Sequence, residues 1–373
     1  MAPLDGLDLY ALKRRFEQAN EWIDAAGALR DLRFLSHARR ALFPLPLLDR
    51  RDERPIDGDA VFPPFDSRPA PALAGKRVAV VGSGGGGACV AVVGVARAFE
   101  EAGVKPALIT ACSGSAIWGS MWAAGMTAAE MASFSLGWRP EDYLDVQWSR
   151  LPAFLVSALR GFSGLAKGEA IEHLVEGRLE GMTAAETEIP LETVVYNLDR
   201  GLVEYFGTTL TPDVRVSELM RIAIALPLFI EAVSVHDHLY VDGGVVDLFP
   251  ARPVIEDGGF DEVFGLNFML PHDFEPEEIT GWDERPMGLM TASRQVQQGA
   301  FLELARRQRD ELGATLTLLT PVDPALLHGV SFYDLFIDRS KWPQMMRAGY
   351  DAASAALDHW RSEAGRPAAH YAR

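Results

Sequence analysis

The sequence has few cysteines and no long uninterrupted apolar run. Only Cys89 and Cys112 occur among 373 residues, which excludes both a secreted disulfide framework and a four-cysteine zinc site. A membrane-spanning helix needs about 18 to 20 uncharged apolar residues, and the nearest candidate, 78–95, contains six glycines. The N-terminus also has no basic segment followed by an apolar core. We therefore expect a soluble, cytoplasmic protein whose contact with membranes or lipid bodies is peripheral if it exists.

Positive charge is scarce as well. The chain has 35 Lys and Arg against 52 Asp and Glu, a net charge of −17. Such a chain repels phosphate backbones, so no nucleic-acid partner is expected. The exception is local, because seven arginines and four acids lie between Arg30 and Arg54. This excess indicates either a solvated helical arm packed on the main domain, which we favour, or a surface that approaches anionic lipid.

Three regions differ in their patterns. Residues 1–74 begin with helical spacing and end in a proline-rich connector, which predicts an N-terminal helical extension. Residues 75–275 alternate short apolar strands with helices and are predicted to form the main core. Residues 276–373 are predicted to form a mainly helical C-terminal region packed on that core.

Strand and helix patterns alternate from residue 77 onward. The valine-rich run 77–81 and the run 107–111 read as buried parallel strands. Each is followed by a helix, about 89–102 and 114–124, and Gly103 is a suitable cap for the first. This order predicts an α/β fold, a three-layer α/β/α sandwich around a mostly parallel sheet with its functional edge at the carboxyl ends of the strands.

The rest of the chain yields further elements by pattern. Residues 127–185 read as mostly helical. The other predictions are strands at 191–198, 203–208, 238–241 and 263–268 and helices at 216–225, 287–313 and 345–363.

A glycine-rich loop follows the first strand. Gly82 to Gly87 reads GSGGGG and fits the dinucleotide-binding pattern GxGxxG. That site needs an acid at the end of the next strand to hold the ribose, but there the chain reads Ala111-Cys112-Ser113. We therefore favour a second use for the loop, in which its amides and the adjoining helix N-terminus stabilise an oxyanion.

A serine turn follows the second strand. A nucleophile on a tight strand-to-helix turn needs small residues two positions before and after it. Around Ser113 these are Ala111 and Ser115, whereas around Ser115 one of them is Ile117, whose branched side chain crowds the turn. Ser113 is therefore the preferred nucleophile. Cys89 and Cys112 are expected to be small buried thiols rather than a second nucleophile.

A serine hydroxyl needs a partner that accepts its proton. His272 and His328 follow the serine in the order of a Ser…Asp…His triad and are candidates. Asp242 competes with them, because it leaves a strand into Gly243-Gly244 and would present its carboxylate on a tight turn. His236 and His238 read as part of a hairpin turn rather than a metal pair.

Taken together, these motifs resemble the patatin-like phospholipases, a family of serine lipid acyl hydrolases. The resemblance covers about residues 76–268. It rests on the glycine loop, 94–103, the serine turn with 116–119, Leu226-Pro227, 239–245 and Phe249-Pro250. Two positions differ from the family pattern: Ala88-Cys89 replaces the usual Arg-Gly, and the serine motif reads AxSxS instead of GxSxG.

The resemblance implies roles for particular residues. It implies Ser113 as nucleophile, Asp242 as its partner in a Ser-Asp dyad, and the amides of Gly84, Gly85, Gly86 and Gly87 as the oxyanion hole. It also implies a lipid or fatty-acyl ester substrate, an acyl-enzyme intermediate, and no metal or organic cofactor. Two other classes stay open, a Ser-His-Asp esterase and a non-catalytic lipid-binding protein on the same fold. The apolar stretch 138–165 reads equally well as a lining for an acyl chain or as a helix packed on the sheet.

Overall fold

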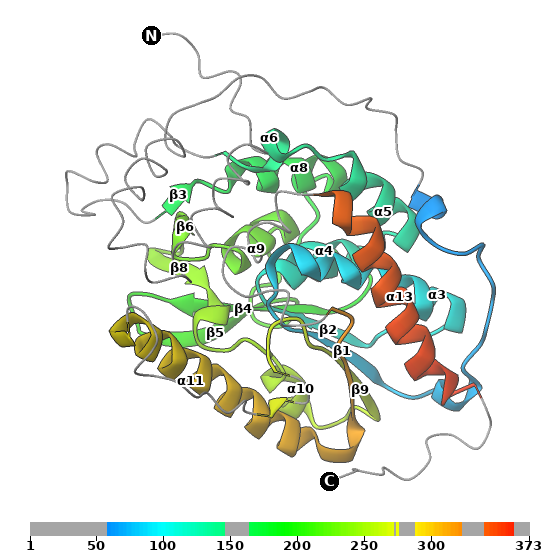
Figure 1. Ribbon diagram of the computed structural model, residues 1–373. Coiled ribbons are helices and arrows are strands. Elements are labelled where there is room, and N and C mark those ends of the chain that lie inside the picture. The colour runs from blue at the N-terminus through cyan, green and yellow to red at the C-terminus, as the bar shows by residue number, and fades with distance from the viewer. Residues whose placement is uncertain (1–57, 146–163, 272–273, 276–287, 323–338, 362–373) are drawn as a thin grey trace.

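The computed structural model describes residues 58–145, 164–271, 274–275, 288–322 and 339–361. It is a three-layer α/β/α arrangement, shown in Figure 1. The strands are β1 (Val78–Gly82), β2 (Leu108–Ala111), β3 (Gly164–Ala166), β4 (Leu191–Asn197), β5 (Leu202–Gly207), β6 (Leu228–Ile230), β7 (Val233–Val235), β8 (His238–Asp242), β9 (Glu262–Leu266) and β10 (Leu316–Leu319).

The central sheet has the order β10-β9-β1-β2-β4-β8-β7, with β5 also paired to β4. The five strands from β10 to β4 are parallel, whereas β5, β7 and β8 run antiparallel to their neighbours. Helices cover both faces of this sheet, so the α/β/α sandwich with a mostly parallel sheet is confirmed.

Strand β4 brings distant parts of the chain together. Strand β5 pairs along one edge of β4, so β2 and β8 share the other edge. They approach from opposite directions: β2 ends at Ala111 opposite Thr193, and β8 ends at Asp242 opposite Val195. Because Thr193 and Val195 are next-but-one neighbours on β4, the carboxyl ends of β2 and β8 meet there.

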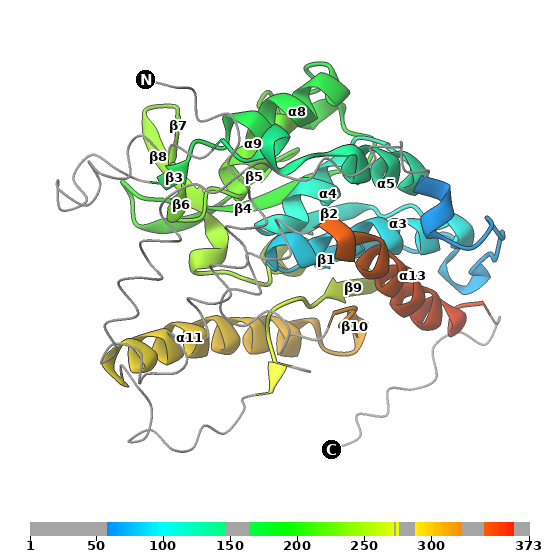
Figure 2. The same ribbon diagram turned by 45° about the horizontal axis from the view of Figure 1, so that its top comes forward.

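The sheet is buried on both faces. Alternate side chains of β1 enter two different cores, with Val80 in one and Val81 in the other. Helices α3 (Ala91–Ala102), α4 (Gly114–Ala123) and α13 (Trp342–Asp358) cover the first face, and α10 (Arg252–Asp257) and α11 (Gly288–Leu312) cover the second, as Figure 2 shows from another direction. Such two-sided burial explains why the strands read as apolar runs.

Helices α3 and α13 pack at backbone distance. A Cβ at Gly94 would lie 1.8 Å from the Met346 carbonyl oxygen, and one at Gly349 would lie 2.0 Å from the Ala91 carbonyl oxygen. Glycine at both positions therefore permits the crossing. This contact, with the pairing of β10 to β9, attaches the described part of the C-terminal region to the core.

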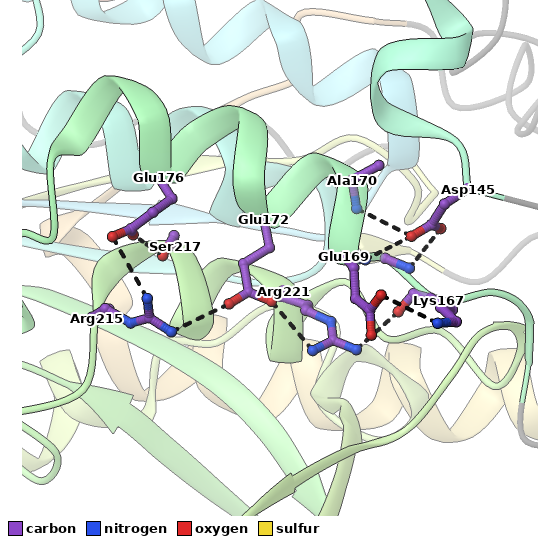
Figure 3. Close-up of polar contacts among 10 residues, drawn as sticks. Asp145, Lys167, Glu169, Ala170, Glu172, Glu176, Arg215, Ser217 and Arg221 are labelled. Atoms are coloured by element: carbon purple, nitrogen blue, oxygen red, sulfur yellow. Dashed lines mark hydrogen bonds and ion pairs between the residues drawn. The ribbon is translucent and has the colours of Figure 1, made fainter.

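A polar network joins α8 (Glu169–Leu179) to α9 (Val216–Ala223) beside the first layer, as Figure 3 shows. The Arg221 guanidinium lies 3.2 Å from the Glu172 carboxylate and donates to the Lys167 carbonyl at 3.1 Å. Arg215 lies near both Glu172 and Glu176. Asp145 accepts hydrogen bonds from the first amides of α8, including those of Gly168 and Glu169, at 2.8 Å. The network fixes α9, which packs against α4.

The remaining helices are α5 (Ala128–Gly137) and α6 (Pro140–Tyr143), with short 3-10 turns elsewhere. Most predicted elements are present within a few residues of their expected bounds. Strands β3, β6, β7 and β10 were not predicted. The extension 1–74 is described only from residue 58, and its division from the core stays a prediction.

Candidate functional site: a serine–aspartate contact beside the glycine loop

Ser113 occupies a sharp turn between β2 and α4. It has φ +52° and ψ −126° and is the N-cap residue of α4, a backbone conformation that L-residues rarely adopt and that is strained. The turn also requires glycine at the next position, because a Cβ at Gly114 would lie 2.2 Å from the Gly86 carbonyl oxygen. The side chain of Ser113 is half-buried, at a helix N-terminus where negative charge is stabilised.

Ser115 has a different place. Its side chain is buried, accepts a hydrogen bond from the Cys112 amide at 2.9 Å and lies 2.8 Å from the carbonyl oxygens of Gly82 and Cys112. Its hydroxyl thus fastens the serine turn to the end of β1. This structural use explains the second serine of the AxSxS motif and leaves Ser113 as the accessible hydroxyl of the pair.

Asp242 ends β8 and meets Ser113. The Ser113 side chain interacts with the Asp242 carboxylate, and this interaction lowers the pKa of Asp242. The carboxylate also accepts from the Gly244 amide, with 2.8 Å between N and Oδ1, and the Asp242 amide donates to the Ala225 carbonyl at 3.0 Å. The structure therefore brings together the two residues that sequence analysis singled out, through the meeting of β2 and β8 on β4.

The Asp242 carboxyl group is fully buried. Burial raises its pKa from 3.8 to about 7, although the hydrogen bonds from Ser113 and Gly244 oppose this shift. The thiol of Cys112 adds to the weakly polar surroundings, with its Sγ 4.0 Å from Oδ1 of Asp242. A carboxylate with a pKa near neutrality is suited to accept and return a proton at physiological pH.

The glycine loop lies beside this contact. A Cβ at Gly84 would lie 3.4 Å from the Ser113 Cβ. The 3-10 turn η4 (Gly86–Val90) follows, with Gly86 at φ +55°. Among the hydrogen bonds of the described residues, none uses the amides of Gly85, Gly86 or Gly87 as donors.

One predicted oxyanion donor needs correction. The Gly84 amide donates to the Leu248 carbonyl at 3.0 Å, so it is not free to bind an oxyanion. Its glycine is required for packing instead, because a Cβ there would meet Leu248 Cδ1 at 2.6 Å. The set of candidate donors is therefore Gly85, Gly86 and Gly87.

The histidine candidates do not enter the described site. His272 and His328 lie outside the described residues. His236 and Asp237 form the turn between β7 and β8 with φ +47° and +64°, and His238 lies 3.6 Å from Asp199. The prediction of a hairpin turn at His236 and His238 is confirmed. Within the described ranges, no group of three metal-ligating side chains could hold a metal ion.

Sequence analysis assigned no role to several buried polar residues around the loops. Ser83 accepts a hydrogen bond from the Phe268 amide at 2.9 Å, which links the glycine loop to the end of β9. Asp247 accepts from Tyr205 at 2.6 Å and from Gln308 at 3.2 Å. The only sequence signal for Asp247 was its place in the segment after Gly243-Gly244. Cys89 and Cys112 are buried free thiols, and burial raises the pKa of both.

The apolar stretch 138–165 is described only in part. Trp138 and Tyr143 are buried in an aromatic cluster with Trp118 and Trp342, so these two residues belong to the core. Residues 146–163 lie outside the described residues, and the question of an acyl-chain lining stays open. No helix in the described part of the chain combines the length and apolarity needed to cross a membrane.

The core of the chain is thus an α/β sandwich that brings together a serine on a strained turn, an aspartate from a neighbouring strand end and a glycine loop. Residues 80–255 match the family model of the patatin-like phospholipases. The chain therefore contains a patatin-like phospholipase domain, and the resemblance noted from the motifs is confirmed.

The similarity to individual proteins is weaker than the match to the family model. An uncharacterized NTE family protein of Mycobacterium tuberculosis is 26% identical over 195 residues, which are 50% of this chain and 29% of that protein. The chain thus spans less than a third of the length of this curated relative.

Two solved structures are similar at lower identity. VipD from Legionella pneumophila has a TM-score of 0.44 and 13% identity, over 76% of this chain and 67% of that one. Human GIVD cytosolic phospholipase A2, solved in complex with methyl gamma-linolenyl fluorophosphonate, has a TM-score of 0.42 and 12% identity, over 95% and 63%.

Proposed function

We propose that the protein is a lipid acyl hydrolase that uses Ser113 and Asp242 as a catalytic dyad and passes through an acyl-enzyme intermediate. One observation carries the proposal: Ser113, held on a strained turn where β2 and β8 meet, interacts with the buried Asp242 carboxylate. The patatin-like phospholipase domain supports a lipid or fatty-acyl ester as substrate.

The first step is attack by the serine oxygen. Asp242 accepts the proton of the Ser113 hydroxyl while Oγ forms a bond to the ester carbonyl carbon. The resulting oxyanion is stabilised by the amides of Gly85 and Gly86, with Gly87 as a further candidate donor. When the intermediate collapses, the alcohol part of the ester leaves with the proton held by Asp242, and Ser113 remains acylated.

The second step removes the acyl group. A water molecule gives its proton to Asp242 and attacks the acyl carbonyl, and the same amides hold the second oxyanion. Collapse releases the fatty acid and restores the Ser113 hydroxyl. No step needs a metal ion or organic cofactor, and Asp242 returns to its starting state.

A triad with histidine is the second candidate. His272 and His328 are the residues that sequence order allows, and they lie outside the described residues. The direct contact between Ser113 and Asp242 favours the two-residue mechanism, because a relaying histidine would stand between serine and aspartate in a triad. His272→Ala and His328→Ala should therefore retain activity, whereas Asp242→Ala should lose it.

The proposal is tested by hydrolysis of a lipid panel. Phospholipids, lysophospholipids and neutral esters are incubated with the wild-type protein and with Ser113→Ala, and released fatty acid is measured. We expect wild-type hydrolysis of at least one class and loss of it in Ser113→Ala, whose folding is checked by thermal melting. Equal hydrolysis by wild type and Ser113→Ala would reject Ser113 as the nucleophile. No hydrolysis by either would reject the proposal and favour a non-catalytic lipid-binding protein.

The proposed activity also suggests where in the cell the protein is found. A hydrolase of aggregated lipids meets its substrate at a surface, so we propose a cytoplasmic protein with peripheral contact to membranes or lipid bodies. Fractionation of cells into soluble and membrane pools, in low and high salt, tests this expectation.

A further inference from the structure

Asp247 is a second buried carboxylate on the loop that carries Asp242, and the proposed mechanism does not use it. Its side chain is 3% exposed, and burial raises its pKa from 3.8 to about 6 despite its hydrogen bonds. An acid buried at such a cost is retained only where its partners compensate for desolvation. The contacts of Asp247 indicate what it holds.

Those contacts come from several elements around the loop. The Tyr205 hydroxyl on β5 donates to Oδ2 at 2.6 Å. Gln308 on α11 donates from Nε2 to both carboxylate oxygens, at 3.2 and 3.3 Å. The Arg252 guanidinium on α10 and the Phe249 amide both act to lower the pKa of Asp247. The charge of Asp247 also contributes to the raised pKa of the Cys112 thiol, which lies next to the serine turn.

The same loop touches both parts of the candidate site. At its start, the Asp242 carboxylate interacts with the Ser113 side chain. Its internal hydrogen bonds run from the Asp247 amide to the Gly243 carbonyl at 2.9 Å and from the Gly244 amide to the Asp242 carboxylate. Immediately after Asp247, the Leu248 carbonyl accepts the Gly84 amide of the glycine loop at 3.0 Å. A displacement of Asp247 would therefore also displace Asp242 on one side and the glycine loop on the other.

From this arrangement we infer that Asp247 is a positioning residue for the reaction. By binding Tyr205 and Gln308, it fixes the loop 242–248, in which Asp242 approaches Ser113 and the Leu248 carbonyl holds the Gly84 amide of the glycine loop. Asp247 touches neither substrate nor the reacting atoms. The inference rests on the proposed function, and it gives α11 a direct connection to the site through Gln308.

Asp247→Ala tests the inference most strongly. It leaves the Tyr205 hydroxyl and the Gln308 amide without their acceptor and frees the loop. Because a displacement of about 1 Å can reduce rate by about 100-fold, we expect kcat on a soluble chromogenic fatty-acyl ester to fall roughly 10- to 100-fold, with little change in KM. The acid limb of the pH profile should move to higher pH, because loss of the Ser113 hydrogen bond removes an interaction that lowers the pKa of Asp242.

Two variants separate positioning from loss of stability. In Asp247→Asn, one oxygen still accepts from Tyr205 and the amide can bond to a rotated Gln308, so kcat should return to within about fivefold of wild type. Glu192→Ala is the matched control: Glu192 is equally 3% exposed, but its carboxylate accepts from the Thr209 amide just after β5 and not from the groups that bind Asp247. We expect it to lower the melting temperature without moving the acid limb.

The outcomes are distinct. A fall in kcat with a shifted acid limb in Asp247→Ala, rescued by Asp247→Asn, supports the inference. An unshifted limb, or equal effects of Asp247→Ala and Glu192→Ala on kcat, overturns it while leaving the proposed function intact. If Asp247→Ala does not fold, Tyr205→Phe replaces it, and there a normal kcat and pH profile overturns the inference. Absence of ester hydrolysis by the wild type rejects the proposed function itself.

Discussion

Two glycine-containing loops form the candidate site, and they use their amides in opposite ways. In the loop after β8, the amides are consumed internally: that of Gly244 binds the Asp242 carboxylate, and those of Val246 and Asp247 bind the Gly243 carbonyl. In the loop after β1, the Gly84 amide binds the Leu248 carbonyl, whereas the amides of Gly85, Gly86 and Gly87 have no acceptor among the described residues. The first loop fixes a carboxylate, and the second leaves amide donors that we propose stabilise the oxyanion formed during the reaction.

The largest expected effect concerns the carboxylate that the first loop holds. Asp242→Asn keeps the size of the side chain but cannot accept the serine proton. We expect kcat on a soluble fatty-acyl ester to fall by about 10²–10⁴, measured under saturating substrate. His272→Ala is the control and should stay close to wild type. A loss of activity in His272→Ala with retention in Asp242→Asn would instead favour a Ser-His arrangement.

The next effect concerns the amide donors of the second loop. A Cβ at Gly85 would lie 2.3 Å from the Cβ of Phe268, so Gly85→Ala must displace the loop. Because loss of one oxyanion donor costs about 2.7–4 kcal/mol of barrier, we expect kcat to fall about 100- to 1,000-fold. The melting temperature is measured in parallel to ensure that the variant is folded.

Gly84 provides the contrast within the same loop. The new Cβ of Gly84→Ala would meet the end of the Leu248 side chain at 2.6 Å, and Leu248→Ala makes room for it. The double variant should keep most of the wild-type kcat, because the Gly84 amide already serves Leu248. A loss of kcat as large as that of Gly85→Ala would contradict the assignment of the Gly84 amide to a structural hydrogen bond and of the other three glycine amides to oxyanion binding.

A smaller effect is expected when a side chain added at Gly244 pushes against the Asp242 carboxylate, and a second substitution can relieve that contact. A Cβ at Gly244 would lie 2.8 Å from the Cys112 Sγ and 3.0 Å from Asp242 Oδ1. We expect Gly244→Ala to lower kcat about tenfold to 100-fold by displacing the carboxylate. Adding Cys112→Ala removes the sulfur and should recover part of the loss. No recovery in the double variant would indicate that backbone strain, rather than pressure on the carboxylate, causes the effect.

The smallest expected effect is on stability and depends on pH. Burial raises the folded-state pKa of Asp242 to about 7, above the value of about 3.9 in an unfolded chain. The folded state therefore favours the protonated acid, and the protein loses stability as pH rises from about 4 to 7. Asp242→Asn is neutral throughout, so its melting temperature should exceed that of wild type at pH 8 and approach it near pH 4. A difference that does not grow with pH would contradict the raised pKa.

Much of this arrangement could be predicted from local sequence. The valine-rich strands, the glycine loop and the small residues around Ser113 gave the α/β order and the serine turn, because tight turns and buried strands restrict which residues fit. The partnership of Ser113 with Asp242 came from family resemblance. From the local sequence pattern alone, Asp242, His272 and His328 were all candidates for the group that accepts the serine proton. The pattern does not indicate which strand ends meet on β4.

Other features depend on contacts that no local pattern encodes. The engagement of the Gly84 amide by Leu248 follows from the path of a loop far along the chain, so Gly84 looked the same as Gly85 in the sequence. The sequence does not distinguish Asp247 from other acidic residues in loops, because its partners Tyr205 and Gln308 are far away along the chain. Strand β10 is short and forms by pairing with β9, and a run of four residues gives little signal of its own.

The most direct test of the central claim is covalent labelling with a fluorophosphonate, which reacts with an activated serine and leaves a stable adduct. Intact wild-type protein is treated with the probe, digested and mapped by mass spectrometry, alongside Ser113→Ala and Asp242→Asn. We expect one adduct on Ser113, none in Ser113→Ala and much slower labelling in Asp242→Asn. An unlabelled wild type, an adduct on another serine, or labelling that is indifferent to Asp242 would contradict the serine–aspartate site.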